Sequence, residues 1–158
     1  MKCVNLLIIN EHLLFREALR ALFRDRSDIR IVGEVCDYGE AMSAACASSI
    51  DIVVLELGLP GLRGIDMIRE LKAMRSTMKI LVLSAQSDIG TVASAMAAGA
   101  NGYLLPHYGI EEMMIAIQKI FEGKRYVSPD IAHEMAKQVI QTDARLLPTQ
   151  PDHPATFL

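Results

Sequence analysis

The sequence has 158 residues, 51% of them hydrophobic and 22% charged, and its 16 Lys and Arg against 19 Asp and Glu leave a formal net charge of −3. This length suits one domain with or without a tail, and the acidic balance argues against direct binding of nucleic acid. Three cysteines without a Cys-x-x-Cys pair argue against a disulfide framework or a zinc site. We expect no signal peptide, no membrane span and a cytoplasmic protein.

Short apolar runs alternate with segments of helical periodicity through most of the chain. We expect strands at 4–9, 29–36, 51–57, 79–84 and 102–105, and helices at 11–25, 39–49, 65–74, 88–98 and 110–122. Five strands that alternate with five helices predict an α/β fold, an open parallel sheet with helices on both faces.

The pattern changes after this alternation. We expect one further helix at 128–141, which starts with Ser128 and Pro129. From Thr142 the helical periodicity ends, and half of the six prolines follow at positions 148, 151 and 154. The sequence thus predicts a folded domain at 1–127, an additional C-terminal helix at 128–141 and a flexible linker at 142–158.

Polar residues follow the ends of four expected strands. They are Asn10, Glu11 and His12 after the first strand, Glu56 after the third, Ser84 after the fourth, and His107 beyond Pro106 after the fifth. Open parallel sheets bind ligands beyond the carboxyl ends of their strands. We therefore place the candidate site at this edge.

Several segments resemble the receiver domain of two-component response regulators, in the NarL/FixJ (LuxR-type) subfamily of transcription factors. They are I-I-N-E-H-L-L-F-R-E-A-L-R-A-L at 8–22, V-V-L-E-L-G-L-P-G-L-R-G at 53–64, I-L-V-L-S-A at 80–85, A-G-A-N-G-Y-L-L at 98–105 and G-K-R-Y-V-S-P at 123–129. The resemblance covers about residues 1–140. It implies a flavodoxin- or CheY-like (βα)5 fold with a five-stranded sheet in the order 2-1-3-4-5.

The resemblance also implies a phosphorylation site. In that family an acidic pair after the first strand holds Mg²⁺, an Asp after the third accepts the phosphoryl group, and a Lys after the fifth neutralises its charge. A Ser or Thr after the fourth strand binds the phosphoryl oxygens and moves together with an aromatic residue on the fifth. Carried over to this sequence, the acidic pair reads Asn10 and Glu11, the acceptor position holds Glu56, the lysine position holds Pro106, and Ser84 and Tyr103 fit the switch positions.

The three departures predict a degenerate site without efficient phosphorylation. Glu56 is one methylene longer than Asp, and a reactive atom misplaced by about 1 Å can cost about a hundredfold in rate. Pro106 supplies no charge to the transferring group. We therefore expect no enzyme, no catalytic residue, no cofactor and no metal; Glu11 and Glu56 are the carboxylates that remain if Mg²⁺ binds.

Several readings stay open at this point. The leading one is a phosphorylation-independent receiver of a transcriptional regulator; its alternatives are a weak phosphoacceptor that uses Glu56 with Mg²⁺, and a small-molecule sensor with Pro106 and His107 at the rim. Glu56 either imitates a phosphoryl group, hydrogen-bonded by Ser84, or is a solvated loop residue. His12 and His107 either join the carboxylates in a transition-metal site or are solvated.

The expected partners follow from the last helix of the sheet and from the resemblance. Helix 110–122 has a wide apolar stripe, and we assign a possible dimer surface to Met113, Met114, Ile117 and Phe121. The subfamily carries a C-terminal helix-turn-helix domain, so we expect DNA contact only through such a covalently attached domain and none with membranes. The sequence leaves open whether the chain is truncated or a natural receiver-only form.

Overall fold

The computed structural model describes residues 2–47, 49–58 and 64–146. In chain order its elements are β1 (Val4–Ile9), α1 (Leu13–Phe23), β2 (Ile29–Val35), α2 (Tyr38–Ala45), β3 (Ile52–Leu55), α3 (Gly64–Met74), β4 (Lys79–Leu83), α4 (Ile89–Ala98), β5 (Gly102–Leu104), the 3₁₀ turn η1 (Pro106–Tyr108), α5 (Gly109–Phe121), β6 (Tyr126–Val127) and α6 (Pro129–Leu146).

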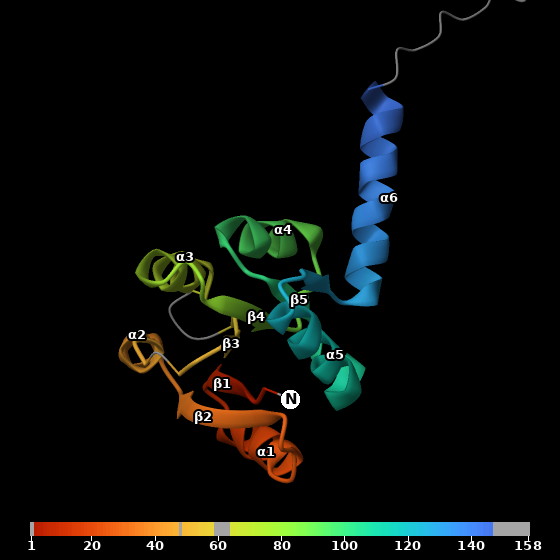
Figure 1. Ribbon diagram of the computed structural model, residues 1–158. Coiled ribbons are helices and arrows are strands. Elements are labelled where there is room, and N and C mark those ends of the chain that lie inside the picture. Colours follow the sequence, from red (N-terminus) through yellow and green to blue (C-terminus); the bar gives the residue numbers. More distant parts are fainter. Residues whose placement is uncertain (1, 48, 59–63, 147–158) are drawn as a thin grey trace, which may run out of the picture. The chain divides into compact units, whose positions relative to one another are not determined.

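The strands form one parallel sheet in the order β2-β1-β3-β4-β5-β6. Helices α1 and α5 cover one face, and α2, α3 and α4 cover the other (Figure 1). The predicted fold class and the order of the first five strands are confirmed. The sequence analysis missed β6, whose two residues pair with Gly102 and Tyr103 of β5.

The central strands are buried because helices cover both faces of the sheet. All four residues of β3 are buried, and four of the five residues of β4 are buried. Leu6, Leu7 and Ile8 of β1 have no exposed surface. The continuous apolar runs that predicted these strands therefore correspond to positions that face the core on either side.

Polar residues fix the connections between elements. Asp37 and Asp88 each cap a helix, accepting the backbone N–H of Glu40 and of Thr91. The amide oxygen of Asn101 accepts the N–H of Ile80 at 3.0 Å. These bonds satisfy backbone groups at the ends of the elements, so the turns at the sheet edges are held in place.

The glycine at the end of α4 is required by the backbone. Gly99 has φ of 120°, a conformation that side chains of L-residues disfavour. A Cβ there would lie 2.9 Å from Cγ of Lys72. Its N–H donates to Met96, which ends the helix and leads the chain into β5.

The chain divides after Ser128 into two compact units. In the second unit α6 extends to Leu146, so residues 142–146, which we assigned to the linker, are helical. The stretch from Asp143 to Leu146 contains no Gly or Pro, and a helix continues until such a residue or an unfavourable cap stops it. The remaining part of the predicted linker, 147–158, lies outside the described residues.

None of the helices in the described ranges is both long enough and apolar enough to cross a membrane.

Candidate functional site at the carboxyl edge of the sheet

The candidate residues occupy the first positions beyond adjacent strands. The N–H of Glu56, just past β3, donates to Ile9 of β1 at 3.0 Å, and the N–H of Ser84, just past β4, donates to Leu104 of β5 at 3.1 Å. These backbone bonds extend the ladders by one residue. The parallel sheet thus brings the ends of β1, β3, β4 and β5 to one edge, as the sequence predicts.

Asn10 turns the chain from β1 into α1. Its side chain is buried, and its amide oxygen accepts the backbone N–H of His12 at 2.8 Å. Its carbonyl oxygen accepts a bond from the guanidinium of Arg16 at 2.6 Å. Both oxygens of Asn10 are therefore engaged in the local turn.

The imidazole of His12 lies between two carboxylates. Its Nε2 is 3.7 Å from Oε1 of Glu11 and 3.8 Å from Oε1 of Glu56. The His12 side chain is largely exposed, so these contacts are screened by water. The arrangement nevertheless brings the imidazole of His12 to the two carboxylates that the sequence analysis singled out.

Glu56 is neither a fully solvated residue nor a paired one. Its side chain is 21% exposed, and its Oε2 is buried without a hydrogen-bond partner among the described residues. Burial raises the pKa of Glu56; nearby His12 lowers it, the Glu11 carboxylate raises it, and the backbone N–H of Glu11 lowers it. Ionised Glu56 is therefore partly desolvated, and His12 and the backbone N–H of Glu11 offset only part of the cost of burying its charge.

Tyr38 is a site residue that the sequence analysis missed. Its hydroxyl donates to the carbonyl oxygen of Glu56 at 3.3 Å. Burial raises the pKa of Tyr38 to about 12, and the carboxylates of Glu56 and Glu11 add to the rise. Its position just past β2, next to β1 in the sheet, was the signal that could have found it.

The two switch positions lie together in the interior. Tyr103 has no exposed surface, and its hydroxyl donates to the carbonyl oxygen of Gln86 at 2.6 Å. Burial raises its pKa, while a hydrogen bond with the Ser84 side chain lowers it. The hydroxyl oxygen of Ser84 also accepts the N–H of Gln86 at 3.1 Å. Ser84 is thus engaged with Gln86 and Tyr103.

The end of β5 carries no cation at the predicted lysine position. Pro106 is exposed and begins the turn η1, in which the ring of His107 stacks on Tyr108 with centroids 4.5 Å apart. The N–H of Leu105 donates to the hydroxyl of Ser128 at 2.8 Å. This strand end is therefore shaped by a proline turn and a buried serine.

The donor set does not fit Mg²⁺ well. Mg²⁺ requires near-octahedral oxygen ligands, usually with carboxylates, but the amide oxygen of Asn10 already accepts a backbone bond. The imidazole of His12 lies against the two remaining carboxylates. We therefore derive no chemical step through a metal at this edge.

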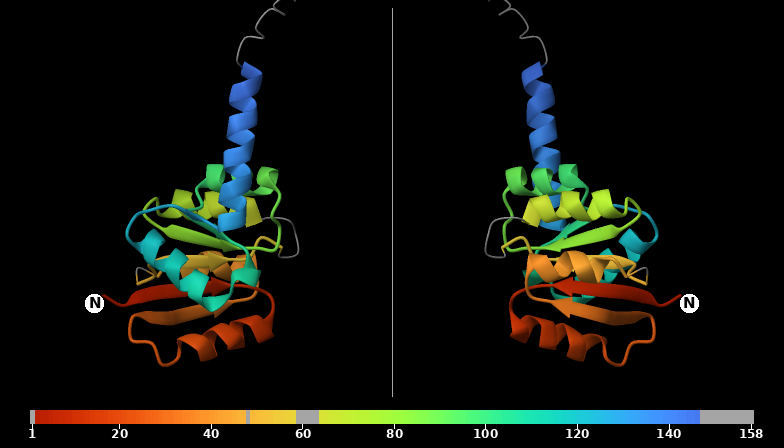
Figure 2. Two further views of the ribbon diagram at one scale, coloured as in Figure 1. Left: turned by 90° about the vertical axis from the view of Figure 1, so that its right-hand side faces the viewer. Right: turned by 90° about the vertical axis from the view of Figure 1, so that its left-hand side faces the viewer.

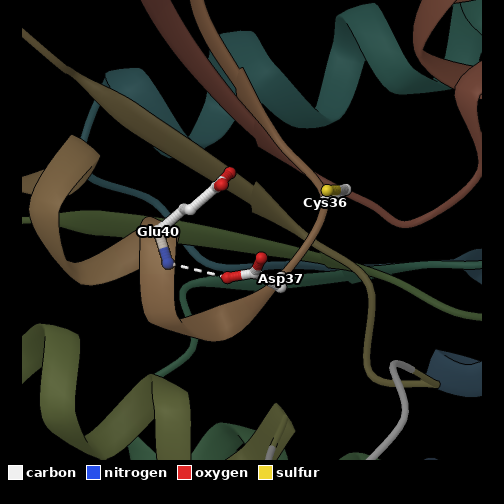
Figure 3. Close-up of side chains that lie close together, drawn as sticks. All are labelled: Cys36, Asp37 and Glu40. Carbon is white, nitrogen blue, oxygen red and sulfur yellow. Dashed lines mark hydrogen bonds between the residues drawn. The ribbon is translucent and has the colours of Figure 1, made fainter.

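A transition-metal site of His12, His107 and the two glutamates is not formed either. Within the described ranges, one group of three metal-ligating side chains has its ligand atoms within 4.8 Å of one another: Cys36, Asp37 and Glu40. Figure 3 shows this group at the start of α2, where the Asp37 carboxylate accepts the Glu40 N–H as a helix cap at 2.8 Å. All three residues are exposed, and a cap explains the position of Asp37.

The predicted dimer surface on α5 needs correction. Met113 is 3% exposed and Ile117 1% exposed, and both belong to the core. Met114 and Phe121 are half-buried against it. The apolar stripe is wide because α5 packs on the sheet through most of it. The exposed apolar residues near this face are Ile115 on α5 and Leu13, Leu14 and Leu22 on α1.

Comparison with known proteins identifies the family of the chain. The model of the response regulator receiver domain matches residues 6–118. The chain belongs to the response regulator receiver family. In this receiver, Glu56 follows β3, Ser84 follows β4 and Tyr103 lies on β5. These are the positions that the resemblance to the receiver family implies.

The chain is similar to two named response regulators. The receiver is 30% identical over 140 residues to response regulator UvrY of Escherichia coli O6:H1, which covers 89% of the chain and 64% of UvrY. It is 30% identical over 152 residues to response regulator GacA of Pseudomonas aeruginosa, which covers 96% of the chain and 68% of GacA. The chain thus spans less than two thirds of the length of UvrY.

Solved structures share the architecture. A LuxR-family two-component response regulator from Aurantimonas sp. SI85-9A1 superposes with a TM-score of 0.83 at 32% identity, covering 88% of this chain and 99% of that one. RcsB, in a structure of two dimers bound to two parallel DNAs, has a TM-score of 0.76 at 17% identity and covers 84% of this chain and 66% of its own. The RcsB likeness concerns the fold alone.

Proposed function

We propose that this receiver regulates transcription without phosphorylation, as a cytoplasmic dimerisation module for a covalently attached DNA-binding domain. The observation that carries the proposal is the arrangement of Tyr103, which is fully buried and whose hydroxyl donates to Gln86, a residue of the chain itself. In the resembled family this aromatic residue moves with the Ser or Thr that follows the fourth strand. An inward position held by the chain itself makes the phosphoryl signal unnecessary.

The chemistry at the carboxyl edge supports the same proposal. Phosphoryl transfer depends on positioning and on charge neutralisation. Glu56 presents its carboxylate from a longer side chain, Asn10 contributes no charge, and Pro106 contributes no cation. If the chain were a weak phosphoacceptor, Glu56 would have to react without a lysine at position 106 and with an incomplete set of metal ligands. We assign no enzymatic activity to the chain.

The dimer is inferred from the exposed apolar residues of the α1 and α5 face. Leu14 is 79% exposed, and Leu13 and Leu22 are more than half exposed. Leu14 and Leu22 lie about two helical turns apart on one side of α1, and they form an exposed apolar pair that a partner surface would cover. RcsB forms dimers in its DNA complex, and a two-fold receiver dimer would set the spacing of two DNA-binding domains.

Intact-mass measurement after incubation with acetyl phosphate and Mg²⁺ tests the proposal. We expect no added phosphoryl group on the wild-type chain. The matched variants are Glu56→Asp alone and Glu56→Asp combined with Pro106→Lys and Asn10→Asp, and we expect the triple variant to be labelled. Labelling of the wild-type chain, lost in Glu56→Gln, would overturn the proposal and make Glu56 a true acceptor.

A further inference from the structure

Two grooves meet at the amino edge of the sheet, opposite the carboxyl edge that carries the receiver site. This edge is where β1 begins, marked N in Figure 2. One groove has a volume of about 390 Å³ and runs between α5 and the start of β1 and β2. The other has a volume of about 410 Å³ and lies beneath the starts of β3 and β4. Lys2 and Phe121 line both, so the two grooves are adjacent.

The first groove is mainly apolar. Its floor is formed by buried Val4, Ile29 and Ile117, and its rim by half-buried Met114 and by Ile115, which is 45% exposed. Ligand pockets of about 300–1,000 Å³ with apolar walls and few polar groups are typical of small-molecule sites. A flexible methionine at the rim can adapt to different shapes.

The charged residues of the first groove largely neutralise each other. Arg26 and Asp28 form a two-bond ion pair at 3.0 and 2.9 Å. Glu122 lies 3.4 Å from the ammonium of Lys124. Of the two cations that line this groove, Lys2 forms no ion pair among the described residues. The uncompensated charge of this groove therefore lies where it adjoins the second groove.

The second groove is basic. Lys2, Arg75 and Lys79 line it against one acid, Asp51, whose carboxylate accepts the N–H of Asn5 at 2.8 Å. The three cations form no ion pair with a carboxylate among the described residues. In a chain with a formal net charge of −3, this local excess is opposite in sign to the whole. Such a patch attracts anions.

Two of these cations also bind backbone carbonyls. Arg75 donates to Ile50 at 2.8 Å, and Lys79 donates to Phe121 at 2.7 Å with its ammonium 5.4 Å from the centre of the Phe121 ring. These bonds hold both cations in position and use only part of their donors, because an ammonium has three and a guanidinium five. The remaining donors are available to a ligand.

The ammonium of Lys72 lies close to other positive charges at this edge. Burial lowers the pKa of the Lys72 ammonium, and the charges of Arg125 and Lys79 lower it further. Like charges close together disfavour the protonated form. An anion bound at this edge would relieve that repulsion.

We propose that the two grooves together bind an amphipathic anion, a small molecule whose apolar body lies against Ile115 and Met114 and whose single anionic group lies beside Lys2 and Lys79. An apolar groove next to a basic one favours an amphipathic anion as the ligand. An apolar molecule without a charge would leave the basic groove empty, and an inorganic anion would leave the apolar groove empty. The site lies apart from Glu56 and does not depend on how phosphorylation works in this chain.

Calorimetric titration with decanoate, kept below its micelle concentration, tests the proposal. Decyltrimethylammonium has the same tail with the opposite charge, and acetate has the same head without the tail. We expect decanoate to bind at least about tenfold more tightly than either, because only it satisfies both grooves. Equal binding of decyltrimethylammonium would overturn the charge assignment, and equal binding of acetate would overturn the apolar groove.

Matched surface variants locate the site. Lys2→Glu and Ile115→Ser should each weaken decanoate binding by about tenfold, whereas Lys119→Glu and Val32→Ser, exposed positions outside both grooves, should leave it unchanged. Equal losses in the controls would overturn the proposal. So would an Ile115→Ser chain that loses dimerisation but keeps its decanoate affinity, because a second copy would then cover this groove.

Sedimentation with lipid vesicles distinguishes a free small molecule from a lipid headgroup as the ligand. The chain is sedimented with phosphatidylglycerol vesicles, and we expect it to stay in the supernatant. Sedimentation with the vesicles, without saturable binding of monomeric decanoate, would assign the edge to a lipid surface and overturn the proposal.

Discussion

The hydroxyl of Tyr103 donates a hydrogen bond of 2.6 Å to the carbonyl oxygen of Gln86. The bond connects the middle of β5 to the loop that follows β4, the same loop whose first residue, Ser84, occupies the hydroxyl position of the receiver site. A phenol that is buried needs such a partner, because an unpaired buried donor costs about 1–3 kcal/mol. The inward position of the ring is therefore stabilised by both packing and hydrogen bonding.

Tyr103→Phe should destabilise the fold by about 1 kcal/mol, the usual net value of one neutral hydrogen bond. Tyr103→Ala should cost about 3–5 kcal/mol, because it also leaves a cavity in the core. Urea unfolding followed by circular dichroism measures both. A Phe variant as stable as wild type would show that the hydroxyl does not hold the ring in its inward position.

Glu56→Gln should make the fold more stable at pH 7, by up to about 1 kcal/mol, because a neutral amide avoids the cost of a partly desolvated carboxylate. The folded pKa of Glu56 is raised above its ordinary 4.5. The penalty is therefore full above the folded pKa, fades as the pH falls through it, and is absent below 4.5.

The pH profile of the Glu56→Gln stability difference checks this reasoning. Urea unfolding of both chains at intervals between pH 4 and pH 8 should give curves that converge at the acid end. Curves that diverge toward acid would mean that the folded state stabilises ionised Glu56, contrary to the burial of Oε2.

Tyr38 should titrate near pH 12, and Glu56→Gln should lower its pKa while leaving it above 10, because burial is the larger cause and remains. Carbon-13 resonances of Cζ-labelled tyrosine follow the titration of each ring. The other three tyrosines serve as internal references. An unchanged Tyr38 pKa in the variant would place the Glu56 carboxylate farther from the phenol than the structure has it.

Leu14→Glu should weaken the proposed dimer by at least about tenfold, because a charge would be placed in an apolar contact. The residue is largely exposed in the single chain, so the stability of the monomer should change by less than about 0.5 kcal/mol. Sedimentation velocity over a concentration series measures the association. Val32→Glu, an exposed residue on β2, is the control. Equal effects of both variants would count against this face.

The fold could be predicted because each central strand is a continuous apolar run between helices of regular periodicity. β6 could not, since two residues carry no periodicity; Tyr126 and Val127 form a strand only because β5 leaves a free edge beside them. The sequence analysis predicts that α6 ends at 141 because the apolar pattern stops there, but the helix continues to Leu146. Helices end at caps and breakers, and a polar stretch can stay helical.

The site could be predicted only in part. Ser84 and Glu56 could be selected because they directly follow strands, and Tyr103 because the resemblance implied an aromatic switch position on the fifth strand. Tyr38 was missed because it belongs to a helix whose first residue reaches the neighbouring strand end. The burial of Met113 and Ile117 also depends on packing, since a stripe of apolar residues does not reveal how much of it the sheet covers. Side-chain engagement, such as that of Asn10 with the His12 amide, likewise needs coordinates.

Ser128 sits at the point where the chain leaves the receiver. Its N–H donates to the carbonyl oxygen of Tyr103 at 2.9 Å, and its hydroxyl accepts the N–H of Leu105 at 2.8 Å. Ser128, which directly precedes α6, is thus bonded at two points along the edge of β5 that faces β6, and its side chain is shielded from water. Because both bonds join Ser128 directly to β5, a shift of that strand by a fraction of an ångström would move Ser128, the last residue of the first unit, along with it.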